Sequence, residues 1–528
     1  MPAPNTEQQI QEIPLEMVGG NTFGRYPKIS IAQTWNMIVS DDGLVDYAGY
    51  KNVQDSPSDK PGRGIYSSSR GNIMVAVWGT QVFAIDNALS LTFVGNLETS
   101  SGDVFMAENN SGEISITDGD KIYVYNWFTQ TNIVEATVPA SLTNPGFISF
   151  QNGRMIVVNT TSNAWYLSEI NNALSYTGAS NSLSALQSKP DKCQAALSTP
   201  GGGNTLILFG HNVAEQWTDI GTALFPYQRS SNFNVDFGTL NASSIASLDN
   251  YIVWLAGNEQ SGATVMVLSG NKAESISTDG INFKLSGLSN PGNCNGFLFR
   301  QDGHVIYQFS FPDDNLSYIY DLNTKKFFTV SDENNNYHIA RNVVFFNNVY
   351  YFVSLKGPNL FAFGTNYTNF DYGDDNIQQI PRIRVPPPIR MPSQLPFIIK
   401  SVGFTIENGR PNTITTIDYN VPDGETLATE SYVDIATESG ILIADEGDGT
   451  TTTINTYTLT SEAVDLSISR DGGESFGASL RLPMNAVGKR KSRFIYQRLG
   501  RANDVSFQFK FIGYGRFVAF DGVVEAYQ

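Results

Sequence analysis

The chain has 528 residues, of which 41% are hydrophobic and 12% aromatic, and this composition excludes a largely disordered protein. Its net charge of −18 excludes a general nucleic-acid binder, because neutralising phosphates requires an excess of lysine and arginine. The length suffices for about two to four domains, each with its own core.

The beginning of the chain carries no targeting pattern. Residues 1–5 (MPAPN) have neither the basic nor the apolar region of a signal peptide, and no run approaches about 18 apolar residues. We therefore expect a soluble protein without membrane insertion, made in a cytoplasm. Cys193 and Cys294 are too few for a disulfide framework or a cysteine-rich zinc site, and we predict that both are buried.

The chain reads as all-β, with 47 glycines and many Asn, Ser and Thr residues at the joints between strands. Residues 1–60 are predicted as an N-terminal strand segment that joins a C-terminal platform. Residues 61–380 contain seven strand–turn–strand hairpins at intervals of about 40 to 55 residues, which is typical of β-propeller blades. The hairpins cover residues 71–86, 113–126, 154–169, 205–219, 251–270, 304–322 and 343–364. A β-helix would need shorter repeats and a single sandwich fewer hairpins, so we predict a propeller of six or seven blades.

Residues 381–396 (PRIRVPPPIRMPSQLP) are predicted as a proline-rich linker, because proline lacks the ladder donor and stiffens the chain. Its Arg382, Arg384 and Arg390 could contact a neighbour, but solvated arginines are the preferred interpretation. Residues 397–528 are predicted as a C-terminal β-sandwich with an insertion at residues 407–465. That insertion holds twelve acidic residues against one basic residue, Arg410, and we expect it to be extended and solvated.

The opposite polarity follows within residues 488–510, which hold seven basic residues and one acidic residue, Asp504. One interpretation is a strand pair with basic outward positions. The other is a docking face for an acidic partner or an adjacent subunit. The candidate contact residues are Lys489, Arg490, Arg493, Arg498 and Arg501.

The stretch SRDGGESFG from Ser469 contains two enzyme-like patterns. The G-x-S-x-G of a nucleophile elbow requires a strand, a turn and a helix, whereas ASLRLP after the motif reads as a strand. The same stretch matches the Asp-box of sialidase-type propellers, which is a structural hairpin turn. We predict such a turn, formed by Ser469, Asp471, Gly472, Phe476 and Gly477, and no catalytic residue.

No metal or cofactor site is predicted. The chain has no H-E-x-x-H or C-x-x-C motif, and its three histidines are scattered. The acidic pairs Asp313–Asp314 and Asp374–Asp375 could serve as glycosidase carboxylates, but acids at loop tips are usually solvated.

The C-terminal stretch from Leu466 resembles the end of the packaged-DNA stabilisation proteins, or tail hub (nozzle) proteins, of short-tailed bacteriophages. The matching residues are Ser469, Asp471, Gly472, Phe476 and Gly477 and, after a basic loop, Tyr496, Arg498, Leu499, Gly500 and Arg501. Residues 206–258 and 34–53 are similar more loosely. The acidic insertion and the proline-rich linker depart from the family pattern.

This resemblance implies a non-enzymatic virion protein of the phage tail, in which a propeller and a β platform assemble as a hexameric ring. The implied partners are other copies of the chain, the portal-adaptor protein, tail fibre, spike or needle proteins, and the double-stranded DNA that passes through the lumen. The ring would retain packaged DNA and then form the conduit for its ejection. The alternative is a sialidase-like or glycan-binding propeller of the tail.

Overall fold

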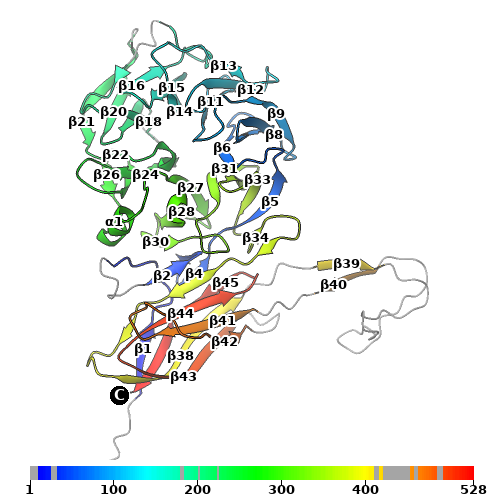
Figure 1. Cartoon of the computed structure of the whole chain (residues 1–528), viewed down its shortest axis with the longest axis vertical. Helices are drawn as coiled ribbons and strands as arrows, with labels where there is room; N and C mark the ends of the chain where they lie inside the picture. Colours follow the sequence, from blue (N-terminus) through cyan, green and yellow to red (C-terminus); the bar gives the residue numbers. More distant parts are fainter. Residues whose placement is uncertain are drawn as a thin grey trace, which may run out of the picture.

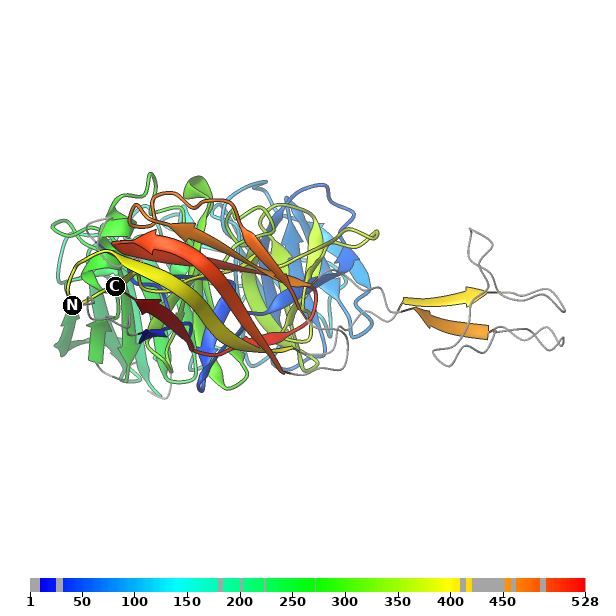
Figure 2. The same ribbon diagram turned by 90° about the horizontal axis from the view of Figure 1, so that it is seen from below.

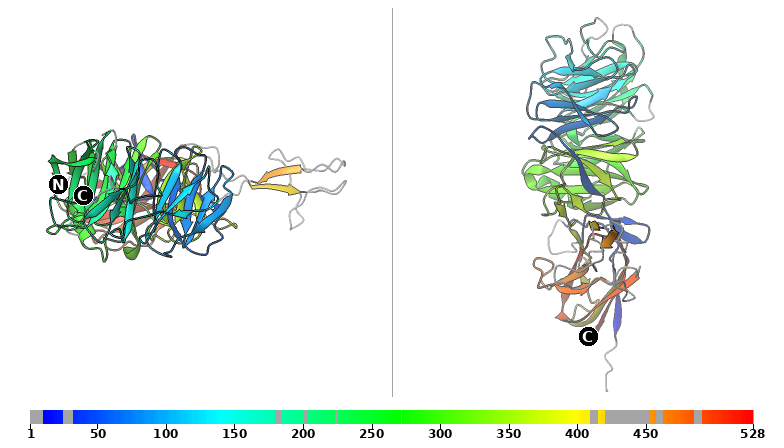
Figure 3. Two further views of the ribbon diagram at one scale, coloured as in Figure 1. Left: turned by 90° about the horizontal axis from the view of Figure 1, so that it is seen from above. Right: turned by 90° about the vertical axis from the view of Figure 1, so that its right-hand side faces the viewer.

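The computed structural model describes residues 10–24, 32–178, 184–199, 203–222, 225–270, 272–408, 415–419, 452–456, 462–484 and 491–527. These residues form two β bodies placed end to end, a ring of sheets and a sandwich (Figures 1 and 3). One α-helix, α1 (Asp279–Ser286), occurs among them. The fold is therefore all-β, as the composition predicted.

The ring is a β-propeller of seven antiparallel units, within the predicted range of six or seven (Figure 1). The first strand of each unit lies against a neighbouring unit, and the first strand of the last unit contacts that of the first, which closes the ring. The units are β6 (Gly62–Ser67), β7 (Met74–Trp78), β8 (Gln81–Ile85) and β9 (Leu91–Asn96); β10 (Phe105–Glu108), β11 (Glu113–Thr117), β12 (Ile122–Asn126) and β13 (Val134–Glu135); β14 (Pro145–Gln151), β15 (Arg154–Asn159), β16 (Ala164–Leu167) and β17 (Ser184–Ala185); β18 (Cys193–Ser198), β19 (Thr205–Gly210), β20 (Ala214–Asp219) and β21 (Tyr227–Val235); β22 (Gly238–Thr239), β23 (Ala246–Leu248), β24 (Tyr251–Gly257), β25 (Thr264–Ser269) and β26 (Lys272–Ser275); β27 (Asn295–Gln301), β28 (His304–Phe311), β29 (Leu316–Asp321) and β30 (Lys326–Thr329); and β31 (Ala340–Phe346), β32 (Val349–Ser354), β33 (Asn359–Gly364) and β5 (Gly49–Asp55).

The middle strands of the blades are apolar on both faces because each blade is covered by its two neighbours. All five residues of β7 are buried, for example. Trp165 of β16 packs edge-on against Trp217 of β20 in the next blade, with ring centroids 5.4 Å apart. Cys193 and Cys294 are buried free thiols, as predicted.

The last blade takes its outer strand from the start of the chain. β5 pairs antiparallel with β33, and on its other side parallel with β34 (Phe370–Asp371), which in turn pairs with β35 (Ile377–Gln378). Tyr50 of β5 stacks on Phe370 at a centroid distance of 4.4 Å. The ring is thus held shut by residues that precede its first blade.

The sandwich has two sheets. The outer sheet consists of β43 (Lys491–Ala502), β38 (Phe397–Asn408), β46 (Gly522–Tyr527), β1 (Gln11–Leu15), β45 (Phe517–Ala519), β4 (Gly43–Asp46) and β3 (Met37–Ser40). The other sheet consists of β36 (Arg382–Val385), β44 (Asp504–Ile512), β41 (Ala463–Ser469), β42 (Leu480–Pro483) and β37 (Ile389–Arg390). β1, β3 and β4 thus bring the N-terminal segment into the sandwich, while β5 belongs to the propeller.

The two bodies share one sheet and one core. β2 (Gln33–Trp35) pairs parallel with β30 of the propeller and antiparallel with β36 of the sandwich. A single buried cluster runs from Phe299 and Phe361 in the blades to Phe404 and Phe509 in the sandwich. Continuous burial of this kind makes the two bodies one rigid unit.

Arg382 and Arg384 do not lie in a solvated spacer, so that interpretation of the two residues is wrong. Both belong to β36, and each side chain is 1% exposed. The sequence pattern failed because a short strand between prolines still pairs on both sides, with β2 and β44. Arg390 is half-exposed and forms an ion pair with Asp504.

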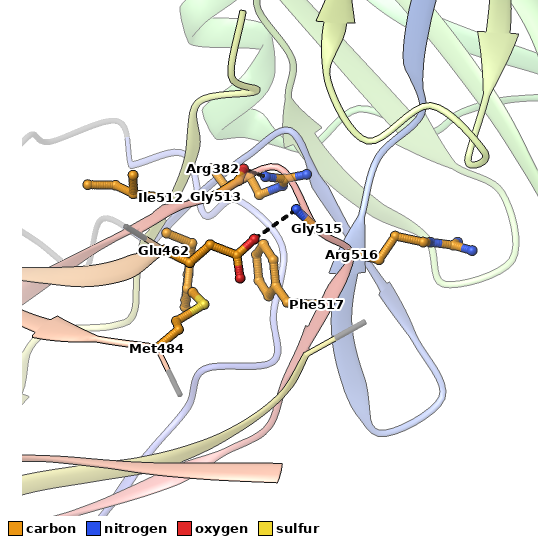
Figure 4. Close-up of a pocket in the computed structure, with 9 residues that line it drawn as sticks. Arg382, Glu462, Met484, Ile512, Gly513, Gly515, Arg516 and Phe517 are labelled. Carbon is orange, nitrogen blue, oxygen red and sulfur yellow. Dashed lines mark hydrogen bonds between the residues drawn. The ribbon is translucent and has the colours of Figure 1, made fainter. Parts of the chain in front are cut away.

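The buried arginines form hydrogen bonds with distant parts of the chain through their terminal nitrogens. Arg382 donates to the carbonyls of Gly513 and Thr368 at 2.9 and 3.0 Å, and its Nε lies 2.7 Å from Oδ1 of Asp46. In Figure 4 it lies beside Phe517. Arg384 donates to the Glu16 carbonyl at 2.9 Å and to the Thr34 hydroxyl at 2.8 Å. Burial lowers the pKa of Arg384 to about 10.

The predicted insertion at 407–465 falls mostly outside the described residues. At its ends, Glu407 lies in β38, and the buried Asp465 lies in β41, where it pairs with Arg481 at 2.7 Å. Within it, β39 (Thr415–Tyr419) pairs with β40 (Thr452–Thr456), and this hairpin stands away from both bodies (Figure 2).

Candidate functional site

β43 is a long strand at the edge of the outer sheet, and it carries the predicted contact residues that the structure describes. It pairs with β38 on one side, and no strand among the described residues pairs with its other side. Side chains alternate between the core and solvent, because successive residues of a strand point to opposite faces. Buried positions are Ser492, Phe494, Tyr496, Leu499 and Ala502, and exposed positions are Lys491, Arg493, Ile495, Gln497, Arg498, Gly500 and Arg501.

A β-bulge breaks this alternation at Arg498. Ile399 of β38 faces Gly500, but Ser401 faces Gln497, so β43 has an extra residue here. Arg498 has φ +61° and Gly500 φ +85°, and the bulge leaves both Gln497 and Arg498 exposed. A left-handed conformation at a non-glycine residue costs about 1–3 kcal/mol and re-aims its side chain.

Arg493 and Arg498 line the same groove, which has a volume of about 720 Å³ on the outer face of the sheet. Its apolar floor is a row in register across three strands, with Gly403 of β38 between Ile495 of β43 and Val523 of β46. Ile495 and Val523 are 39% and 40% exposed, which is unusual for aliphatic side chains in the middle of a sheet.

The charges around the groove are arranged by side. Glu12 and Asp521 lie toward β1, and Lys400 pairs with Glu525 at 3.0 Å in the middle. The hydrogen bond from Lys400, followed by that from Ser401, lowers the pKa of Glu525. The β43 side is basic.

The guanidinium groups of Arg493, Arg498 and Arg501 are in no ion pair with any residue that the structure describes, unlike those of Arg390, Arg481 and Arg516. Lys489 and Arg490 lie outside the described residues. The structure therefore brings two predicted contact residues, Arg493 and Arg498, into one groove and leaves Arg501 on the same exposed edge strand.

The Ser469–Gly477 stretch is a turn between β41 and β42. Asp471 accepts hydrogen bonds from the backbone N–H groups of Glu474 and Ser475, each at 3.1 Å, and from the Ser475 hydroxyl. Hydrogen bonds from the Ser469 and Ser475 hydroxyls lower the pKa of Asp471. Gly472 has φ +82°, a conformation that only glycine adopts readily.

The turn is followed by a strand and not by a helix. β42 pairs with β41, Phe476 is half-buried, and the Gly477 N–H donates to the Ile468 carbonyl at 3.0 Å. A nucleophile elbow needs a helix here. Ser475 therefore sits in a hairpin, with its hydroxyl hydrogen-bonded to Asp471.

Arg470 is a residue of this region that sequence reasoning missed. Its guanidinium donates to the carbonyls of Leu499 and Arg501, at 2.7 and 3.3 Å. The two halves of the phage-like motif therefore meet in space, and the turn supports the bulge that presents Arg498. In the sequence, the one indication of this role is that Arg470 is the basic residue of the predicted turn.

The two acidic pairs that could have served as glycosidase carboxylates lie at turns in the structure. Asp313 and Asp314 receive hydrogen bonds from the Asn290 side chain and the Ser289 N–H, both at 2.9 Å, and Asp374 and Asp375 lie at a turn with positive φ. The cavity beside Arg382 has a volume of only about 10 Å³, and Glu462 there accepts the Gly515 N–H (Figure 4). No cluster of three metal-ligating side chains occurs among the described residues, and none of the described helices is long and apolar enough to cross a membrane.

Comparison with known proteins gives fold neighbours and a family. No curated protein matches the sequence. Among solved structures, a streptogramin B lyase is 13% identical over 60% of this chain and 97% of its own, with a TM-score of 0.41. A virginiamycin B lyase from Staphylococcus aureus is 13% identical over 60% of this chain and 99% of its own, with a TM-score of 0.42. The N-terminal domain of Nup159 is 11% identical over 62% of this chain and 96% of its own, with a TM-score of 0.40. Likeness at this level carries no argument about function.

A family model described as "Bacteriophage P22 Gp10, beta-propeller" matches residues 24–365, which is more than half of the chain. The matched residues include all seven blades and the strands β3, β4 and β5 that precede them. The chain therefore belongs to the phage-stabilisation family of bacteriophage P22 Gp10, a family of phage structural proteins.

Proposed function

We propose that this protein is a tail hub, or nozzle, subunit of a short-tailed phage. Copies of the chain form a ring, hexameric by family resemblance, below the portal and its adaptor protein. The ring retains the packaged DNA and becomes the conduit for its ejection, with tail fibre, spike or needle proteins as further partners. Family membership supports the structural role, and the unpaired basic edge of β43 supports the assembly.

The rigidity of the chain suits a part that confines DNA. The propeller and the sandwich share the sheet through β2 and the core around Phe361 and Phe404. A force applied to one body is therefore transmitted to the other without bending between them. The buried ion pair between Arg382 of β36 and Asp46 of β4 joins the two sheets of the sandwich. A hinge between the propeller and the sandwich would let the lumen yield under the packaged DNA.

The charge of the chain suits a conduit. With a net charge of −18, the chain as a whole repels phosphate, so DNA would pass without being held by many ion pairs. The cations of β43 are then best explained as contacts between proteins.

The test is charge reversal at the edge strand. Phage particles carrying Arg498→Glu and Arg501→Glu should assemble poorly and lose DNA, measured as the nuclease-protected genome per particle. Arg70→Glu with Lys51→Glu, at two exposed positions of the propeller, is the matched control and should leave DNA retention unchanged. Normal particles that keep their DNA in the β43 variant would refute the assembly role. Glycan hydrolysis by the purified protein at enzymic rates would instead favour the sialidase-like alternative.

A further inference from the structure

The basic edge of β43 has an acidic counterpart in the same chain. Residues 409–461 contain nine aspartates and glutamates and one basic residue, Arg410, a net charge of −8 (1 − 9). They leave the sandwich after Asn408 of β38 and return before Glu462. Every copy of the protein therefore carries one acidic segment and one basic edge, and opposite charges on one chain favour a head-to-tail contact between identical subunits.

The described part of the acidic segment lies away from its own copy's β43. The hairpin β39–β40, which belongs to it, projects away from the sandwich (Figure 2), and among the described residues its strands pair only with each other. The three guanidinium groups of Arg493, Arg498 and Arg501 have no ion-pair partner among the described residues of their own chain. The basic edge therefore has no ion-pair partner among the described residues of its own copy, and the segment of opposite charge leaves the sandwich after Asn408.

Building on the proposed ring, we propose that the acidic insertion of one copy binds the β43 edge and groove of its neighbour. The groove offers the apolar row of Ile495, Gly403 and Val523 beside the arginines, so an occupant gains burial as well as ion pairs. A head-to-tail contact of this kind, repeated by every copy, closes a ring when the rotation between neighbours divides a full turn, which the proposed ring requires.

The contact must be collective, because a single exposed ion pair is worth about 0–1 kcal/mol and weakens with salt. Three arginines on one edge, one of them presented by the bulge, allow several guanidinium–carboxylate pairs to form together. Self-association should therefore fall steeply as salt rises.

The test uses the full-length chain in four forms, followed by light scattering and electron microscopy at about 0.1 M salt. The edge variant is Arg493→Glu, Arg498→Glu and Arg501→Glu. The insertion variant is Asp445→Lys, Glu446→Lys and Asp448→Lys, and the fourth form carries all six changes. Each triple variant should raise the concentration for half-assembly at least tenfold, and the six-fold variant should recover most of the loss, because the charges again complement each other.

Rescue in the six-fold variant is the decisive result, since a variant that merely misfolds is not repaired by three more changes. Circular dichroism and thermal unfolding of each form verify the fold. If the insertion variant assembles like the wild type, the proposal is overturned. If only the edge variant then loses rings and DNA retention, the proposed ring function stands, and the β43 edge binds a partner other than the acidic insertion. If the wild type forms no rings at all, the proposed function itself fails.

Discussion

The guanidinium of Arg470 lies 2.7 Å from the carbonyl oxygen of Leu499, across the two sheets of the sandwich. This contact joins the hairpin turn at Asp471 to the bulge at Arg498, which are separate in sequence. Tyr496 makes a second link of this kind, because its hydroxyl donates to the Val464 carbonyl at 2.7 Å. The phage-like motif is therefore one structural device that fixes the edge strand.

Gly500→Ala should destabilise this device. Gly500 has φ +85°, and an added Cβ would lie 3.2 Å from Nη2 of Arg470. The substitution would therefore strain the backbone and disturb the hydrogen bond from Arg470 to the Leu499 carbonyl. We expect a loss of about 1–3 kcal/mol in the free energy of unfolding, measured by urea denaturation. The control is Gly403→Ala, whose Cβ meets no atom closer than 3.6 Å and which should change stability by less than about 1 kcal/mol. Equal effects of the two changes would contradict the assignment.

Asp46→Ala should be among the most damaging single changes between the two sheets of the sandwich. It leaves the buried charge of Arg382, 1% exposed, without its carboxylate, and such a loss costs about 3–5 kcal/mol. The matched surface change is Asp302→Ala, which removes a half-exposed partner 3.4 Å from Arg516 and should cost under about 1 kcal/mol. Urea unfolding of the two variants distinguishes these costs, and a small effect of Asp46→Ala would mean that the packing of the two sheets does not depend on this pair.

His338 makes the fold sensitive to acid. Burial among Tyr47, Tyr50 and Phe352 lowers its pKa to about 3, against an ordinary value of 6.5; the charge of Asp332 opposes this shift, and that of Lys356 adds to it. The unfolded chain binds this proton more readily, so stability falls as pH drops from about 6.5 toward 3, by up to about 1.4 kcal/mol per pH unit.

The measurement is the free energy of unfolding between pH 7 and 4 in wild type and in His338→Gln, which keeps an acceptor for the Ala340 N–H. The variant should have the shallower slope, by about one proton, whatever its absolute stability. His211→Gln, at an exposed position, should leave the slope unchanged. Parallel curves for wild type and His338→Gln would rule out this residue as the source.

Tyr50 tests how strongly the ring closure depends on β5. Tyr50→Ala removes the ring stacked on Phe370 and should cost about 3–5 kcal/mol, whereas Tyr50→Phe removes the 2.6 Å hydroxyl contact to Tyr372 and should cost about 1 kcal/mol. Hydrogen exchange should show lost protection first in β33 and β5. Loss confined to the sandwich would contradict a closing role.

The blades were predictable from sequence because each hairpin is local: Val, Ile, Tyr and Phe strands meet at a turn within about 20 residues. The junction was not. The solvation of Arg382 and Arg384 was misjudged because their partners, Asp46, Thr34 and Gly513, are brought near only by the complete fold.

The candidate edge was predictable in part. The clustering of basic residues in the sequence indicated Arg493, Arg498 and Arg501. The groove, the bulge and the hydrogen bond from Arg470 to Leu499 depend on which strand pairs with β43. No local pattern specifies that β43 lies at an edge, since a half-buried strand alternates in the same way in the middle of a sheet.

The closing strand also sets the order of events on the ribosome. Asp55 of β5 accepts a hydrogen bond from Asn359, which is 304 positions later in the chain. At about 5–20 residues per second, the nascent β5 waits tens of seconds for its partner β33. During synthesis the N-terminal strands are therefore unpaired edges exposed to premature association, and a chain released before residue 364 cannot complete its ring.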